Sequence, residues 1–405
     1  MVSPSPAAAA LAERVRARAA DLNDELVAFR RDLHAHPELS RAEHRTTDRV
    51  ATRLEAAGLT VRRLEGTGLI CDIRARAEGP SGGMVALRAD LDALPLREVS
   101  GLGFASTVRG VAHACGHDMH TTVVLGAGLV LADLATQGDL HSDVRLIFQP
   151  AEEVQPGGAL DVMRAGGLEG VEAIFALHCD PKFDVGQVGT RIGPITSASD
   201  TVTVTLTSTG GHTSRPHLAG DLVAALGHVI TAVPAMLTRR IDPRSGVNLT
   251  WGAVRAGNAP NAIPSVGSVT GTLRCLDAGA WAYAQELLVD VAKQVVAPTG
   301  VEVDVQIVRG VPPVDNDEKS VRFLDESART ALGPDSLQLT EQSLGGEDFA
   351  WYLTEIKGAM ARLGTRTPGG RTYDLHRPDV IFDEDAIGVG VRFLTQAAAR
   401  AGRER

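Results

Sequence analysis

Cysteine is scarce in this chain of 405 residues. Its four cysteines, Cys71, Cys115, Cys179 and Cys275, stand far apart and form no CxxC pair. In a chain of this size, such spacing argues against a disulfide framework. A cysteine with a special role should therefore owe that role to metal binding or to chemical reactivity.

Long apolar runs and basic blocks are also missing. No apolar stretch reaches the length of a membrane span, and residues 7–11 are too short and too weakly apolar for the core of a signal sequence. Acidic residues outnumber basic ones by 50 to 40, for a net charge of -10, and no basic cluster could follow a phosphate backbone. We therefore expect a cytoplasmic protein that binds neither membrane nor nucleic acid.

Hydrophobic residues, by contrast, make up 44% of the chain, and its length exceeds what one core usually supports, so we expect two domains. In the first half, helix-like and strand-like patterns alternate, which predicts an α/β fold with a mostly parallel sheet flanked by helices. The expected helices span residues 8–33, 46–57, 120–135 and 159–165, and the expected strands span 68–74, 84–89, 143–148 and 171–177.

A different pattern begins near residue 200, where residues 201–207 alternate threonine with valine or leucine. The elements that follow are a helix at 221–239, strands at 247–255 and 268–276, a helix at 278–296 and a strand at 301–308. This β-α-β-β-α-β order is typical of the ferredoxin-like α+β arrangement. We therefore expect a lid of about 110 residues, at 199–311, inserted between two parts of a catalytic domain, 1–198 and 312–405.

The strongest local signal is the run HACGHDMH at residues 113–120, between an extended stretch and a helix. Cys115 and His117 are two residues apart and could project to the same side of an extended segment. Thiolate and imidazole are ligands for zinc, nickel, cobalt or manganese. The alternative is a buried core cysteine with histidines at a helix cap or on the surface.

Carboxylates and further histidines follow other expected strands. Glu152 and Glu153 come directly after the strand at 143–148, where open α/β sheets bind their ligands, although an acidic pair there can be a solvated loop. We expect their side chains to diverge, so that one binds metal and the other acts as a general base. His178 follows another strand, and His376 lies near the C-terminus; each alone could be structural. Asp90 could orient a ligating imidazole or cap a turn.

Taken together, these strings resemble the amidohydrolase branch of the aminoacylase and carboxypeptidase metallopeptidase family, which contains hippurate hydrolases and auxin-conjugate hydrolases. The resemblance covers nearly the whole chain. The matching motifs are HAHPELS at 34–40, LRAD at 87–90, the run at 113–120, FQPAEE at 148–153, GGH at 210–212, NAIP at 261–264, GTLR at 271–274 and EDFA at 347–350.

The resemblance implies a dinuclear site. Its two divalent ions, which could be manganese, zinc, nickel or cobalt, would be held by Cys115, His117, Glu153, His178 and His376. Glu152 would be the general base and later the proton donor. Relatives outside this branch use a histidine where Arg88 stands and a bridging aspartate, so the cysteine marks the branch.

The resemblance also implies that the inserted lid is a dimerisation domain, so that the protein is a homodimer. His212 would reach the site of the neighbouring subunit and stabilise the oxyanion. Asn261 and Arg274 would hold the free carboxylate of the substrate. From the sequence pattern alone, Arg274 is an ordinary charge on a strand face.

The expected activity is hydrolysis of the amide bond of N-acyl amino acids or related small amides, of the aminoacylase or hippurate hydrolase type, by a metal-activated water. Three alternatives stay open. They are a dipeptidase or carboxypeptidase with the same dinuclear site, a catalytically silent ligand-binding homologue, and a cysteine hydrolase built on Cys115 and a histidine.

Overall fold

The computed structural model describes residues 6–75 and 82–401, and the chain forms two compact units. The larger unit takes in the chain up to Ile195, Asn316–Glu341 and the chain from Trp351 onward. The second unit consists of Thr196–Asp315 together with Gln342–Ala350. The short stretch Gln342–Ala350 groups with the second unit because Ser197 and Arg274 both donate hydrogen bonds to the carbonyl of Leu344. The sequence analysis placed Gln342–Ala350 in the second part of the catalytic domain. Its proposed boundaries, at 199 and 311, stay a prediction.

A mostly parallel sheet forms the centre of the larger unit. Within the described residues its strand order is β1-β2-β4-β3-β5-β16-β6-β15. Strands β3, β4, β5 and β16 run parallel to their neighbours in the middle of the sheet, and antiparallel pairs occur toward its edges. The strands are β1 (Val61–Arg63), β2 (Leu69–Ile73), β3 (Gly82–Asp90), β4 (Ser142–Gln149), β5 (Val171–Asp184), β6 (Val188–Thr190), β15 (Leu337–Leu339) and β16 (Lys357–Arg366).

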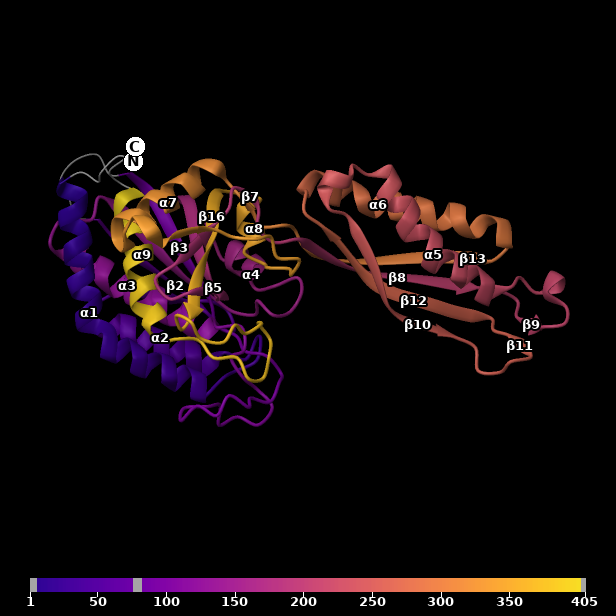
Figure 1. The fold of residues 1–405 in the computed structure, drawn as a ribbon, viewed down its shortest axis with the longest axis horizontal. Coiled ribbons are helices and arrows are strands. Elements are labelled where there is room, and N and C mark those ends of the chain that lie inside the picture. Colours follow the sequence, from indigo (N-terminus) through magenta and orange to yellow (C-terminus); the bar gives the residue numbers. More distant parts are fainter. Residues whose placement is uncertain (1–5, 76–81, 402–405) are drawn as a thin grey trace. The chain divides into compact units, whose positions relative to one another are not determined.

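Helices flank this sheet, as the alternating pattern predicts. Helices α1, α3 and α9 pack against one another beside the sheet, with α7 next to α9 (Figure 1). Central strands such as β4 are buried along almost their whole length, which is the pattern of a parallel sheet covered on both faces. The helices are α1 (Pro6–Ala35), α2 (His44–Ala56), α3 (His117–Thr136), α4 (Ala159–Arg164), α7 (Glu318–Leu332), α8 (Ala350–Leu353) and α9 (Asp385–Ala401), with a 3₁₀ turn at Pro334–Ser336.

The second unit has its own sheet and core. Its four strands are antiparallel in the order β10-β12-β8-β13, and α5 and α6 cover one face (Figure 1). The chain order β8-α5-β10-β12-α6-β13 is the expected β-α-β-β-α-β order. The elements are β8 (Ala198–Thr207), β9 (Gly211–His212), α5 (Leu222–Arg240), β10 (Asn248–Ala256), β11 (Ala262–Ile263), β12 (Val266–Cys275), α6 (Ala278–Val296) and β13 (Glu302–Val311), with 3₁₀ turns at Pro216–Leu218, Pro243–Ser245 and Ala297–Thr299. Short strands β7 (Gly193–Pro194) and β14 (Asp315–Asn316) lie where the chain passes between the units.

Within residues 6–75 and 82–401, two helices are long and apolar enough by length and composition to cross a membrane, which corrects the expectation that no segment reaches that length. One is α3, whose apolar window is 83% buried inside the larger unit, and the other is α5, with 33% buried. The burial of α3 explains its composition, because a helix surrounded by core on every side has no face that needs polar residues. In α5 the buried residues recur at helical spacing, as in Leu222, Leu226, Val229 and Val233.

Candidate metal centre

Side chains from five segments of the larger unit meet at the carboxyl ends of its parallel strands. Asp90 ends β3, Glu152 and Glu153 follow β4, and His178 lies within β5. Cys115 and His117 stand at the start of α3, and His376 belongs to the loop between β16 and α9. An open α/β sheet binds its ligands at this edge, because loops that leave neighbouring strands converge there.

A glycine turn sets the direction of Cys115 and His117. Gly116 lies between them with a φ of 91°, a left-handed conformation, and it is the N-cap of α3. The predicted extended segment is therefore wrong, and the helix begins at His117 rather than at His120. The turn still brings the two ligand-type side chains together, since their ligand atoms and that of His178 all lie within 4.8 Å of one another.

Two groups of three side chains share Cys115. The first is Cys115, His117 and His178, where Cys115 Sγ lies 3.5 Å from His178 Nε2. The second is Cys115, Glu153 and His376, where Glu153 Oε1 lies 3.4 Å from His376 Nε2. The structure thus brings together the five side chains that the sequence analysis named as ligands.

Glu152 and Glu153 do not diverge as expected. Glu152 Oε2 and Glu153 Oε1 each lie 3.9 Å from His117 Nε2, so both carboxylates face the same imidazole. The backbone after β4 is bent rather than extended, and Ala151 takes a φ of 57°. Because the chain turns here, adjacent side chains can point to one side.

The cluster has the properties of a cation site. His117 Nε2 and Glu153 Oε1 are buried, and neither has a hydrogen-bond partner among the described residues. A buried polar atom without a partner is costly, and a bound cation would satisfy both atoms at once. Thiolate, imidazole and carboxylate together form a donor set suited to zinc, nickel, cobalt or manganese. The residues present therefore fit divalent metal.

Protonation in the metal-free chain follows burial and local charge. Burial and the Glu153 carboxylate raise the pKa of the Cys115 thiol well above its ordinary value. Burial and the charge of Arg362 lower the pKa of His178 well below its ordinary value, so this ring is neutral, as metal binding requires. A cation bound beside Cys115 would favour the thiolate.

Asp90 forms its hydrogen bond with His120, an imidazole outside the proposed ligand set, rather than with a ligating imidazole. Its Oδ1 accepts a hydrogen bond from Nδ1 of His120 at 2.7 Å, and its Oδ2 accepts one from Arg88 at 2.7 Å. Nε2 of His120 accepts the N–H of Cys179 at 2.8 Å, so both ring nitrogens of His120 are engaged. His117 is oriented instead by the carbonyl of Asp92, which accepts from Nδ1 at 2.9 Å.

Two of these contacts were missed by sequence reasoning. His120 lies in the run at 113–120, but its hydrogen bonds go to Asp90 and Cys179, which are distant in the sequence. Asp92 stands two positions after Asp90, and no local pattern distinguishes it from a turn aspartate. The one available signal was the acidic spacing of Asp90 and Asp92 at the end of β3.

The three remaining site residues lie in the second unit. His212 is exposed on β9, and its Nδ1 accepts hydrogen bonds from the N–H and hydroxyl of Ser214 at 3.1 and 2.9 Å. Asn261 is also exposed, and its carbonyl accepts the N–H of Thr213, next to His212. Arg274 stands eight positions along β12 from Val266, which is roughly 26 Å at the rise of a strand. One chain therefore brings His212 and Asn261 together and keeps Arg274 away from them.

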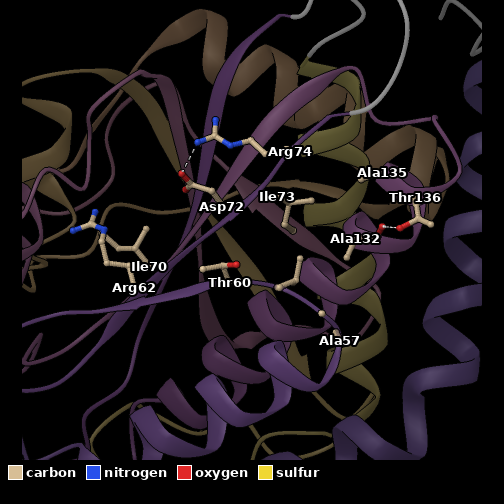
Figure 2. Close-up of a pocket in the computed structure, with 12 residues that line it drawn as sticks. Ala57, Thr60, Arg62, Ile70, Asp72, Ile73, Arg74, Ala132, Ala135 and Thr136 are labelled. Carbon is tan, nitrogen blue, oxygen red and sulfur yellow. Dashed lines mark hydrogen bonds and ion pairs between the residues drawn. The ribbon is translucent and has the colours of Figure 1, made fainter.

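A separate pocket lies in the larger unit, away from this cluster. Its cavity of about 550 Å³ lies between β1, β2 and the carboxyl ends of α2 and α3. Figure 2 shows that Arg74 on its wall forms an ion pair with Asp72. None of the proposed ligands lines this pocket.

Comparison with known proteins identifies the family. Residues 86–400 match peptidase family M20/M25/M40. An N-acetyl-L-cysteine deacetylase of Bacillus subtilis is 36% identical over 382 residues, which cover 94% of this chain and 88% of that protein. The solved structure of the Bacillus subtilis YXEP protein, described as a dinuclear metal binding peptidase from the M20 family, has a TM-score of 0.84 at 33% identity and covers 95% of this chain and 99% of that one.

A longer protein of Rhodococcus jostii, which bears the name of a glutamate–cysteine ligase, is 50% identical over 372 residues. The match covers 91% of this chain but 46% of that protein, so the chain spans about half of that relative. The mostly parallel sheet, the cluster of metal-type ligands and the family match over residues 86–400 agree with one another. The chain therefore belongs to peptidase family M20/M25/M40 and is a metal-binding hydrolase of that family.

Proposed function

We propose that the chain hydrolyses the amide bond of N-acyl amino acids or related small amides, with two divalent metal ions and with Glu152 as the general base. The observation on which this depends is the pair of three-residue groups that share Cys115. Each group offers three donor atoms, and together they could hold two ions. Cys115, His117 and His178 would hold one ion, and Cys115, Glu153 and His376 the other; manganese, zinc, nickel or cobalt would fit.

The surroundings of Glu152 support its proposed role as the base. Its side chain is 10% exposed, and its carboxylate lies beside His117, outside the two groups that share Cys115. When bound, the ions would polarise the amide carbonyl and lower the pKa of the attacking water. Glu152 would accept a proton from this water and later donate it to the departing nitrogen, which yields a carboxylic acid and an amine.

The likeness to a deacetylase of an N-acetyl amino acid favours an N-acyl amino acid substrate, in which the amine product is an amino acid. A dipeptidase or carboxypeptidase with the same site is the second candidate, because the family description names peptidases and a peptide bond needs the same chemistry. A catalytically silent protein would have no need of Glu152. A cysteine hydrolase would need a thiol with a lowered pKa, whereas burial and Glu153 raise the pKa of Cys115.

The second unit would serve as lid and dimerisation domain. Ser214 donates its N–H to Nδ1 of His212, so the neutral ring has its proton on Nε2, the tautomer that could donate a hydrogen bond to an oxyanion. Asn261 precedes the start of β12 and Arg274 stands near its end, so in one chain the two are too far apart to bind the same carboxylate. We therefore propose that His212 and Asn261 act on a partner subunit's substrate, while Arg274 acts on its own.

The decisive experiment combines a substrate panel with Glu152→Gln. The wild-type chain, loaded with each of the four metals, should hydrolyse N-acetyl, N-benzoyl or indole-acetyl amino acids faster than dipeptides. Glu152→Gln should lower kcat by about 10²–10⁴-fold and keep two metal ions per chain by elemental analysis. A variant with near wild-type turnover would show that Glu152 is not the base. Resistance to chelators together with inactivation by thiol alkylation would instead favour the cysteine hydrolase.

A further inference from the structure

Two buried carboxylates hold the turn that contains Glu152 and Glu153. Three consecutive backbone N–H groups donate to them. The N–H of Ala151 donates to Glu43 Oε1 at 2.8 Å, that of Glu152 to Asp92 Oδ1 at 3.0 Å, and that of Glu153 to Asp92 Oδ2 at 2.9 Å. Every residue of the turn that presents the proposed base and ligand is therefore fixed through its main chain.

These carboxylates are themselves anchored. Asp92 is 1% exposed and accepts the hydroxyl of Ser40 at 2.6 Å. Glu43 is fully buried and accepts the hydroxyl of Thr67 at 2.6 Å. Across residues 6–75 and 82–401, no lysine or arginine forms an ion pair with either carboxylate. A buried carboxylate is normally costly, and the hydrogen bonds from the turn offset part of that cost for both groups.

Asp92 also contacts the ligand on the other side of the cluster. Its carbonyl oxygen accepts a hydrogen bond from Nδ1 of His117 at 2.9 Å, and its Oδ1 lies 3.4 Å from the same nitrogen. This hydrogen bond puts the proton on Nδ1 and leaves Nε2 free to face the carboxylates of Glu152 and Glu153. Asp92 thus contacts both the imidazole of His117 and the turn whose two carboxylates lie 3.9 Å from that imidazole.

We propose that Asp92 is a positioning residue of the hydrolytic centre, which sets the distance between His117 and the Glu152–Glu153 turn. The inference rests on the proposed function, because it assigns to Asp92 the task of arranging groups named there. Ala151 supports it, since its φ of 57° is disfavoured for alanine and persists where the surroundings hold it. Without Asp92 the turn can relax, and both carboxylates then move relative to His117.

The test is Asp92→Asn. The asparagine has the same shape and keeps one acceptor oxygen, but its amide nitrogen would face a backbone N–H that needs an acceptor. We expect metal affinity, measured by titrating the apo-protein with zinc or manganese, to fall about 10–100-fold. The variant should also lose kcat by a similar factor with KM within about threefold of wild type, because the substrate contacts are unchanged.

Asp72→Asn is the matched control. Asp72 lies on β2 of the same sheet and accepts hydrogen bonds from Arg145 at 2.7 and 2.8 Å, so its loss should lower the unfolding temperature of the apo-protein. Metal affinity and kcat should stay at wild-type values, because Asp72 contacts no part of the cluster. If Asp92→Asn has wild-type metal affinity, the positioning role is wrong, whatever the activity.

The two proposals can fail separately. If the wild-type chain binds two ions but hydrolyses no amide, the proposed function fails, and the metal affinity of Asp92→Asn still tests the positioning role. If Asp92→Asn does not fold, Ser40→Ala replaces it, because that variant removes a hydrogen bond that orients Asp92 and leaves both bonds to the turn. A several-fold loss of metal affinity in Ser40→Ala supports the positioning role, and an unchanged affinity overturns it.

Discussion

At the scale of single residues, the space around Gly116 decides where Cys115 and His117 can stand. A Cβ placed on Gly116 would lie 2.8 Å from Cys179 Sγ and 2.9 Å from Cys179 Cβ, closer than real side-chain contacts. The φ of 91° is also one that other residues rarely adopt. Both constraints act on the one residue between two proposed ligands.

Gly116→Ala should therefore lower metal content sharply. To relieve the clash with Cys179, the turn must move, and Cys115 and His117 move with it; we expect metal affinity to fall at least about tenfold. Gly138→Ala is the control, because Gly138 has a φ of 78° but open space around its Cβ position. The control should lose about 1 kcal/mol of stability and no metal. Equal metal content in both variants, by elemental analysis, would refute this account.

Which site residues could be read from the sequence depends on how local their signal is. Cys115 and His117 stand in one short motif, and Glu152 and Glu153 stand directly after a predicted strand, so local sequence alone points to these four residues. His376 comes from a loop whose place is fixed by a long-range hydrogen bond from its N–H to the carbonyl of Ala114, and only the family resemblance pointed to it. Long-range hydrogen bonds to the main chain leave no pattern in the local sequence. Those of Asp92, which reach a turn 60 residues away, are another example.

At the scale of elements, α1 is joined to α3 and to the loop between β3 and α3 by a buried polar cluster. Arg30 and His34 of α1 both contact Asp118 of α3, at 2.7 and 2.8 Å. Nε2 of His34 also contacts Glu98 in the loop, at 3.1 Å. Because both ring nitrogens face carboxylates, His34 carries a proton on each. Burial opposes this charge, but Asp118 and Glu98 raise the pKa of His34 above its ordinary value.

Glu98→Gln tests this connection through the pH dependence of stability. Burial opposes ionisation of Glu98, but hydrogen bonds from His34, Ser100 and Ser106 lower its pKa from 4.5 to about 2. Its stabilising contribution is therefore present above about pH 4.5 and is lost as pH falls toward about 2. The contribution of protonated His34 has the opposite sign and is lost as pH rises through its raised pKa.

We expect Glu98→Gln to lower the free energy of unfolding by about 1–3 kcal/mol between about pH 5 and pH 7. The difference from wild type should shrink on both sides of this range. Denaturant unfolding at a series of pH values measures it, and a difference that does not change with pH would contradict the ion pair.

The elements themselves were mostly predictable because hydrophobic periodicity is local. The helix expected at 278–296 has those bounds, and the strand expected at 143–148 extends one residue further at each end. Strand β16 was not delimited, although it is buried along most of its length in the middle of the sheet. Its sequence, KGAMARLGTR, mixes charged residues with alanine and glycine and shows no period of two, so that only tertiary burial turns it into a strand.

At the scale of the whole molecule, our proposal divides the substrate contacts between two copies of the chain. His212 and Asn261 lie together, while Arg274 stands roughly 26 Å along β12 from the end that they occupy. A complete site would therefore use Glu152 and Arg274 of one subunit with His212 and Asn261 of the other. In a two-fold symmetric dimer, this arrangement gives two identical shared sites.

Mixed dimers test this arrangement directly. A dimer of one Glu152→Gln chain and one His212→Ala chain, isolated with two different affinity tags, should have about half the wild-type activity, because one of its two sites has both intact residues. A dimer of a wild-type chain and a chain with both substitutions has the same composition, but neither site is complete if His212 acts across subunits. That second dimer should be nearly inactive. If instead it has half the activity and the first dimer has almost none, His212 serves the site of its own chain.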